Sequence, residues 1–253
     1  VWVYIVRYHT IVKSAFLTTV LIISTLTCLF PVAFCESSNW PSYGNDSSNT
    51  GYSPSTAQLT NQTLWTYTTG GTVPSSPAVV GDVVYVGSND DKMYALNATT
   101  GDHIWNYTTG SSIFSSPAVA YGTVYFGSND FSIYALNATD GTQTWNFTTG
   151  GTISFASPTV AYGVVYAGST DYTLYALNAT DGTSIWNYTA GSGVPCCPAV
   201  SNGIVYITTW MDRKVCALNA TTGDQIWNYT TGGVVKSSPA VTNGIVYVGS
   251  YDH

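Results

Sequence analysis

One string of about seventeen residues occurs four times along this chain of 253 residues. It reads YALNATTGDHIWNYTTG at 94–110 and recurs with few changes at 134–150, 175–190 and 216–232. Five tryptophans mark the repeat at spacings of 40, 40, 41 and 41 residues: Trp65, Trp105, Trp145, Trp186 and Trp227. A catalytic motif normally occurs once in a chain, so recurrence at a fixed spacing indicates an architecture built by stacking equivalent units.

Each unit contains three turn signals and only β-type segments between them. The first turn lies in SPAVVGDVVYVGS (76–88), and later copies place Tyr-Gly or Asn-Gly there, the latter being the strongest short hairpin signal. A second turn carries one aspartate per copy: Asp90, Asp130, Asp171, Asp212 and Asp252. The third turn runs through Asn-Ala-Thr to a glycine before each tryptophan. Three tight turns within about 40 residues predict four short antiparallel strands, and no segment shows a competing helical period.

Four-stranded units at this period predict an all-β chain folded as blades of a β-propeller. We expect each tryptophan to lie on the outermost strand and to fill the wedge between neighbouring blades, where a large flat side chain buries much area. We expect the glycine of the preceding turn to supply a backbone angle that other residues resist. These docking residues are Trp65, Trp105, Trp145, Trp186 and Trp227 with Gly101, Gly141, Gly182 and Gly223.

The spacing of Ala95, Asn97, Gly101 and Trp105, repeated in three later copies, resembles the tryptophan-docking motif of the pyrroloquinoline quinone (PQQ)-type propeller repeat. The family usually has Asp where every copy here has Asn. The resemblance covers residues 40–253, and the Asn-rich copies look most like secreted archaeal cell-surface propellers. It implies residues 36–63 as a lead-in and 64–253 as propeller repeats, with 64–70 an outermost strand. Because the last repeat stops early, we expect a truncated ring of about five blades.

The first 35 residues differ in kind from the rest. Arg7, His9 and Lys13 precede the uncharged, mostly apolar residues 14–35, as in a secretory signal peptide. A membrane anchor stays open as an alternative, because the stretch is long enough to span a bilayer. Either interpretation predicts a secreted or cell-surface protein, extracellular or periplasmic, that meets the membrane only through this N-terminal segment.

Charge and cysteine content exclude several classes of partner and site. Beyond residue 35 only four basic residues oppose 13 acidic ones, too few to neutralise the phosphates of a nucleic acid. Outside the leader stand Cys196, Cys197 and Cys216, an odd number without metal-ligand spacing. The adjacent pair replaces the Ser-Ser of other copies, which favours a substitution of small residues over a redox site.

The residues offer no carboxylate cluster for catalysis. A quinoprotein dehydrogenase, which the repeat resembles, needs a catalytic Asp, a Ca²⁺ held by carboxylates and amides, and basic residues over the quinone. The only glutamate is Glu36, and the turn aspartates recur equally in every copy, which indicates turn closure. We therefore expect no catalytic, cofactor-binding or metal-binding residue. PQQ and Ca²⁺ enter only under the alternative of a PQQ-dependent dehydrogenase fragment.

The function expected is a non-catalytic scaffold or interaction module at the cell surface, with a protein or cell-envelope partner. A BamB-like outer-membrane assembly scaffold is a second alternative. Candidate N-glycosylation sites lie in N-x-T triplets on the outermost strands, at Asn106, Asn146, Asn187 and Asn228. The irregular turn with Trp210, Arg213 and Lys214 is a candidate contact, with loop drift as the alternative.

Overall fold

The computed structural model describes residues 3–7, 39–53 and 62–252, and every regular element in them is a β-strand. The predicted leader lies outside the described residues apart from β1 (Val3–Arg7). Among the described residues, no helix has the length and apolar character needed to cross a membrane. The predicted all-β class is confirmed.

Four antiparallel sheets of four strands each follow one another along the chain. The first blade comprises β2 (Ala78–Val80), β3 (Val83–Gly87), β4 (Lys92–Asn97) and β5 (His103–Thr108). The second comprises β6 (Ala118–Ala120), β7 (Thr123–Gly127), β8 (Ser132–Asn137) and β9 (Gln143–Thr148). The third comprises β10 (Thr159–Ala161), β11 (Val164–Gly168), β12 (Thr173–Asn178) and β13 (Ser184–Thr189). The fourth comprises β14 (Ala199–Ser201), β15 (Ile204–Thr208), β16 (Lys214–Asn219) and β17 (Gln225–Thr230).

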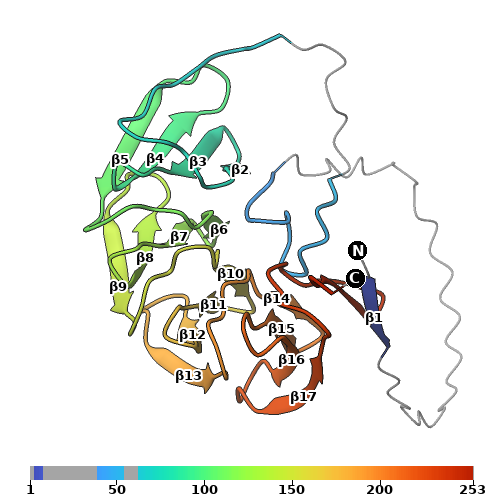
Figure 1. The fold of residues 1–253 in the computed structure, drawn as a ribbon. Helices are drawn as coiled ribbons and strands as arrows, with labels where there is room; N and C mark the ends of the chain where they lie inside the picture. Colours follow the sequence, from blue (N-terminus) through green and yellow to red (C-terminus); the bar gives the residue numbers. More distant parts are fainter. Residues whose placement is uncertain (1–2, 8–38, 54–61, 253) are drawn as a thin grey trace, which may run out of the picture.

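A fifth sheet has three strands in the order β1-β19-β18, with β18 at Ala240–Thr242 and β19 at Ile245–Gly249. β1 pairs antiparallel with β19, in the place that the third strand holds in the other blades. The five sheets are arranged around an arc, with the short first strand of each blade on the inside and the fourth on the outside (Figure 1). The predicted partial propeller of four-stranded blades is confirmed.

The prediction of an outermost strand at residues 64–70 is wrong. Residues 62–69 have no strand pairing in the structure. A fourth strand forms on the edge of a third strand, as β5 does on β4, and no described residue provides that third strand here. Trp65 nevertheless reaches the first blade, and its indole Nε1 donates a hydrogen bond to the carbonyl of Ala98 at 2.9 Å.

The lead-in residues 39–53 lie inside the arc, against the innermost strands (Figure 1). Their carbonyls accept hydrogen bonds from four blades, with N–H donated by Val79 to Trp40, Val119 to Pro41, Val200 to Ser47 and Val241 to Ser48. The Asn49 amide also donates to the carbonyls of Pro198 and Pro239, both at 3.2 Å. The lead-in therefore satisfies inner strand edges that would otherwise be unpaired.

Each of the first three blades is joined to the next by a tryptophan on its outermost strand. Trp145 on β9 of the second blade is typical: its Nε1 donates to the Ala179 carbonyl of the third blade at 3.0 Å. The same carbonyl accepts a hydrogen bond from the Tyr125 hydroxyl at 3.0 Å, and the two rings lie 5.8 Å apart. Trp105 and Trp186 dock in the same way on the Ala138 and Ala220 carbonyls. Trp227 packs on Tyr206, with ring centroids 6.0 Å apart.

The docking glycines are required for two reasons. Gly182 has φ of +73°, which disfavours any residue with a side chain. A Cβ built there would also lie 2.7 Å from the Trp145 ring. Gly101, Gly141 and Gly223 meet the preceding tryptophan at the same 2.7 Å. The sequence predicted the backbone angle, whereas the close approach of the indole is seen only in the structure.

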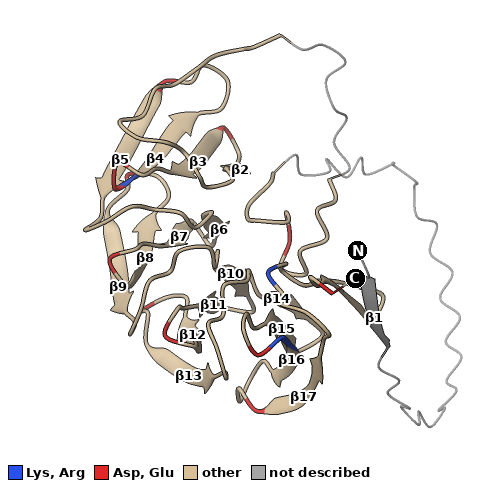
Figure 2. Cartoon of the chain, in the orientation of Figure 1, with Lys and Arg blue, Asp and Glu red and all other residues tan. Residues whose placement is uncertain are grey.

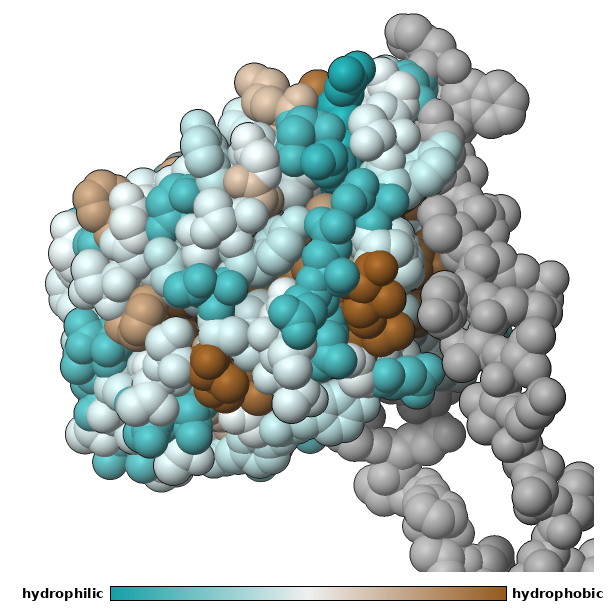
Figure 3. Space-filling model, turned by 90° about the horizontal axis from the view of Figure 1, so that it is seen from below, coloured by the Kyte–Doolittle hydropathy of each residue, from teal (hydrophilic) through white to brown (hydrophobic). Residues whose placement is uncertain are grey.

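The outside of the arc carries little that distinguishes one blade from another. Acidic and basic residues are few and lie scattered over the blades (Figure 2). In the view of Figure 3, apolar side chains appear as separate spots within a neutral to hydrophilic surface. Isolated apolar residues of this kind are normal on a protein surface and need no partner.

Candidate functional site

The two ends of the blades form two different faces. The face called here the turn face carries the turns between first and second strands and between third and fourth strands. The loop face carries the turns between second and third strands, such as residues 169–172 and 209–213, and the longer connections between blades, such as 149–158 and 190–198. The repeats are most alike on the turn face and differ most on the loop face.

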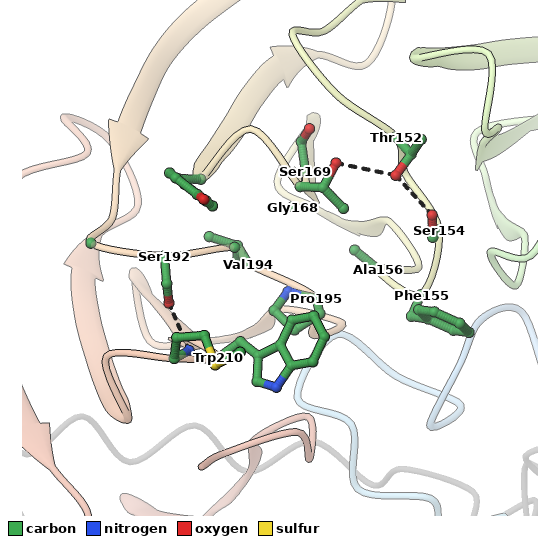
Figure 4. Close-up of a pocket in the computed structure, with 15 residues that line it drawn as sticks. Thr152, Ser154, Phe155, Ala156, Gly168, Ser169, Ser192, Val194, Pro195 and Trp210 are labelled. Atoms are coloured by element: carbon green, nitrogen blue, oxygen red, sulfur yellow. Dashed lines mark hydrogen bonds between the residues drawn. The ribbon is translucent and has the colours of Figure 1, made fainter.

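A pocket of about 460 Å³ opens on the loop face between the third and fourth blades. It is called here the loop-face pocket. It is lined by two connections between blades, 152–156 and 191–195, and by the turns that contain Tyr172 and Trp210. Figure 4 shows the Trp210 indole beside Pro195, with Ser192 and Val194 on one side and Ser154 and Phe155 on the other. Its volume lies within the usual range for small-molecule sites.

The Trp210 turn is longer than its counterparts and is held in place by Ser192. The Trp210 N–H donates to the Gly193 carbonyl at 3.1 Å, and the Met211 N–H donates to Ser192 Oγ at 3.0 Å. Ser192 Oγ in turn donates to Asp212 Oδ1 at 2.6 Å. The inserted residue thus sits in a fixed turn, which presents Trp210 and Met211 at the pocket.

The opposite wall is a connection that is also longer than in other blades, with Ser154-Phe155 where the second blade has Phe114 alone. Ser154 Oγ donates to Asn129 Oδ1 at 2.8 Å and lies 2.8 Å from Thr152 Oγ1, a hydroxyl that can supply the proton of the second hydrogen bond. Thr152 Oγ1 lies 3.1 Å from Thr170 Oγ1 across the pocket wall (Figure 4). Phe155 remains 69% exposed. Two insertions in the repeat therefore face each other across the same pocket.

None of the described residues that line the loop-face pocket is charged. Six of them carry a hydroxyl: Thr152, Ser154, Ser169, Thr170, Tyr172 and Ser192. On the turn face, two pockets repeat at equivalent positions of successive blades, one beside Tyr121 and one beside Tyr162. Repetition marks those two as consequences of the repeat, whereas the loop-face pocket arises where the repeat is broken.

Another pocket, of about 340 Å³, lies on the inside of the arc, next to the loop-face pocket. It is called here the axial pocket. Its rim is formed by the residue that precedes the Ser-Ser-Pro triplet, or its equivalent, in each blade, a position that varies between Pro, Phe and Lys: Pro74, Phe114, Phe155, Pro195 and Lys236. The rings of Phe114 and Phe155 lie 5.7 Å apart, and Lys236 Nζ lies 5.1 Å from the centre of the Trp210 ring. Phe155 and Pro195 line both pockets.

The adjacent cysteines occupy the structural places of serines. In the second blade Ser115 Oγ accepts the Gly127 N–H at 2.7 Å, and in the fourth blade Cys196 Sγ accepts the Thr208 N–H at 3.2 Å. Cys197 donates its backbone N–H to Ser238 Oγ at 2.9 Å, as Ser116 does to Ser157 Oγ at 2.8 Å. These thiols are free and buried, and burial raises the pKa of Cys196 to about 12.

Cys216 stands where other blades have a strand tyrosine. It is buried and free, and burial raises its pKa to about 11. Its Sγ lies 4.0 Å from the Tyr188 hydroxyl. Thiols with raised pKa values are poor nucleophiles at neutral pH, so all three cysteines have the character of core residues.

The turn aspartates serve the fold. Asp130 Oδ1 accepts the Ser132 N–H at 3.1 Å, which closes the turn, and Oδ2 accepts the Tyr134 hydroxyl at 2.7 Å. Oδ2 also accepts the N–H of Gly110, at the end of the preceding blade, at 2.8 Å. Asp90 and Asp171 repeat all three bonds. The link to the preceding blade was not anticipated, although a glycine follows every outermost strand.

The axial pocket does not fit PQQ with Ca²⁺. Within the described residues, no group of three His, Cys, Asp or Glu side chains could hold a metal ion. Lys236 is the only charged residue among those lining the axial pocket. A quinone with three carboxylates needs more than one cation, and Ca²⁺ needs carboxylate oxygens. The site therefore lacks the groups that would hold either.

The other predicted residues are placed as follows. Arg213 donates from Nη1 to the Gly232 carbonyl at 3.1 Å. Of the predicted contact residues Trp210, Arg213 and Lys214, Trp210 lines the loop-face pocket and the two basic residues do not. The side chains of Asn106, Asn146, Asn187 and Asn228 are exposed on the outermost strands. By contrast, the turn residue Asn97 accepts the N–H groups of Thr99 and Thr100, both at 2.9 Å.

Phe155, Tyr172, Pro195 and Lys236 were not anticipated as site residues. The sequence held a signal for two of them, because Phe155 accompanies an insertion and Lys236 is a base where the other blades have Pro or Phe. No local signal joins them to Trp210, because the residues come from three separate repeats. Only the packing of neighbouring blades brings them together.

Known structures share the fold of this chain. No curated protein sequence matches this chain. The crystal structure of BamB from Moraxella catarrhalis aligns with TM-score 0.55 and 16% identity, over 74% of this chain and 88% of that one. Quinohemoprotein alcohol dehydrogenase from Comamonas testosteroni aligns with TM-score 0.69 and 20% identity, over 79% of this chain and 42% of that one. This chain thus spans less than half the length of the dehydrogenase.

At such low identity these structures show the shared fold alone. The family evidence comes from the sequence itself. A family profile described as "Outer membrane protein assembly factor BamB" matches residues 55–194 and 189–253, which is most of the chain. The chain belongs to this family of PQQ-type, BamB-like propellers.

Proposed function

We propose that this chain is a non-catalytic propeller scaffold outside the cytoplasm, which binds a protein or another component of the cell envelope through its loop face. One observation carries the proposal: the repeat is broken on the loop face, and the breaks expose apolar side chains. Phe155 is 69% exposed and Met211 is 67% exposed. Exposed apolar groups gathered at one site mark interaction surfaces.

The titratable residues support a scaffold rather than an enzyme. Three of the turn aspartates are committed to turn closure and blade contacts, as shown for Asp130. The buried thiols have raised pKa values. The axial pocket does not fit the quinone of the dehydrogenases that share the fold. The family profile and the structure of BamB support an envelope location, where a leader at residues 1–35 would direct the chain.

The proposal is tested by sedimentation of the full chain with isolated cell envelopes. In one variant, Phe155→Ser and Met211→Ser remove the exposed apolar groups of the loop face. In a matched control, Tyr121→Asn and Tyr162→Asn change equally exposed residues of the turn face, 70% and 72% exposed. The asparagines are taken from the same turn of later repeats, at Asn202 and Asn243.

We expect the loop-face variant to lose envelope binding at least tenfold while the control retains it. Both variants should unfold at the denaturant midpoint of the parent, because exposed substitutions change stability by about 0.5 kcal/mol or less. Equal binding by the two variants, or no binding by the parent chain, would contradict the proposal.

A further inference from the structure

We infer that the loop-face pocket is a binding site for a neutral carbohydrate. The inference rests on the proposed function and deepens it, because it names the chemistry of an envelope component that the same face would reach. No charged residue is among the described residues lining it, so a charged ligand inside the pocket would lose its hydration without an ion pair to the lining; Lys236, beside the Trp210 ring, lines the neighbouring axial pocket instead.

The polar groups of the pocket suit a ligand rich in hydroxyls. Hydroxyl side chains both donate and accept hydrogen bonds, and six of them line the pocket, of which Ser192 is already bonded within the Trp210 turn. Tyr172, 53% exposed, adds a phenol at the edge. Thr152, Ser154 and Thr170 already form one hydrogen-bonded row along the wall, which fixes the direction of their lone pairs. A sugar offers the same mixture of donors and acceptors in return.

The aromatic groups suit the other surface of a sugar ring. Trp210 is 38% exposed, its backbone N–H is bonded to the Gly193 carbonyl, and its indole lies beside Pro195 (Figure 4), so the ring offers a flat surface at the pocket. Phe155 lies across Pro195 from it (Figure 4). The apolar C–H face of a sugar can lie on such a ring while its hydroxyls meet the polar wall.

A proline-rich peptide is the competing occupant, since aromatic grooves also bind extended proline-rich segments. Two observations favour the sugar. The lining places hydroxyls beside three aromatic rings, and a proline-rich peptide offers those hydroxyls carbonyl acceptors but no N–H donors, whereas a sugar offers both. The pocket is also closed by two connections and two turns rather than extended along a strand edge. The peptide therefore becomes an outcome of the test.

The test is isothermal titration of the full chain with maltotriose, cellotriose, xylotriose and N,N′,N″-triacetylchitotriose, with trigalacturonate as the anionic comparison and a decaproline peptide as the competitor. We expect saturable binding of at least one neutral trisaccharide and none of trigalacturonate or decaproline. Trp210→Ala should weaken binding at least tenfold, Trp210→Phe less, and the turn-face control Tyr121→Asn not at all.

Absence of binding by all four neutral sugars, binding of decaproline instead, or unchanged affinity in Trp210→Ala would overturn the inference. Phe155→Ser provides a second variant at an exposed position, and unfolding midpoints show that each variant is folded. The two proposals fail separately. Loop-face envelope binding without sugar binding would remove only the carbohydrate, whereas sugar binding without a loop-face effect on envelopes would remove only the scaffold function.

Discussion

Replacing Gly182 by alanine tests the docking of tryptophan between blades, and the same blade supplies its control. Gly182 lies in the turn between β12 and β13, and Gly163 lies in the turn between β10 and β11. Their φ angles are nearly equal, +73° and +76°. A Cβ at Gly182 would lie 2.7 Å from the Trp145 ring, whereas a Cβ at Gly163 would meet nothing within 4 Å. The pair therefore separates the backbone cost from the cost of displacing the indole.

The magnitudes follow from these geometries. The left-handed angle alone costs an alanine about 1–2 kcal/mol, so this is the loss of stability expected for Gly163→Ala. Forcing a methyl group against a packed ring adds about 1–3 kcal/mol. The indole cannot simply move away, because its Nε1 donates to the Ala179 carbonyl at 3.0 Å and Trp145 is only 7% exposed. We therefore expect Gly182→Ala to lose about 2–5 kcal/mol.

Urea unfolding of the full chain, followed by intrinsic fluorescence and by circular dichroism, measures both variants against the parent. The midpoint of Gly182→Ala should fall clearly below that of Gly163→Ala. Equal midpoints would refute the reasoning, because they would mean that contact with the Trp145 ring contributes nothing beyond the backbone angle.

Three further predictions follow from the same contacts. Trp145→Ala should cost about 3–5 kcal/mol as a large buried truncation, whereas Trp210→Ala should cost less than about 1 kcal/mol; equal shifts of the urea midpoint would show that docking is not stabilising. Iodoacetamide at pH 8 should leave Cys196, Cys197 and Cys216 unmodified until denaturant is added, because burial blocks access to the thiols and raises their pKa values above the ordinary range. Peptide mass spectrometry reads the labelling, and rapid labelling of the native chain would contradict this. In protein from a glycosylating secretory host, glycopeptide mapping should find sugar on Asn106, Asn146, Asn187 and Asn228 more than on Asn97, whose side chain is bonded in its turn; the reverse order would show that turn bonding does not protect an asparagine.

The blades could be predicted from the sequence because their signals are local. A glycine turn, an alternating strand and a tryptophan recur every 40 or 41 residues, and each copy repeats the evidence of the others. The residues 64–70 show the limit of such reasoning. They have the sequence of an outermost strand but not its conformation, since a strand depends on a neighbour that sequence similarity does not supply.

The candidate site was less predictable for the same physical reason. Trp210 could be singled out as an irregularity, but Phe155 and Lys236 come from other repeats and reach it only when neighbouring blades pack. The hydroxyls of Tyr85, Tyr125 and Tyr166 were likewise unassigned, although they share the docking carbonyls with the tryptophans. The repeat marks the tryptophans that dock between blades, but the partners of such contacts depend on packing across the interface and cannot be read from a single repeat.

Calorimetric titration of the full chain with PQQ in the presence of Ca²⁺ tests most directly whether this propeller is a scaffold or part of a quinoprotein. The axial pocket offers Lys236 as the only charged residue in its lining, and no group of three metal-ligating side chains exists among the described residues. The account predicts no saturable heat and no Ca²⁺-dependent change when Lys236→Met is compared with the parent. Saturable micromolar binding that requires Ca²⁺ would contradict the central claim.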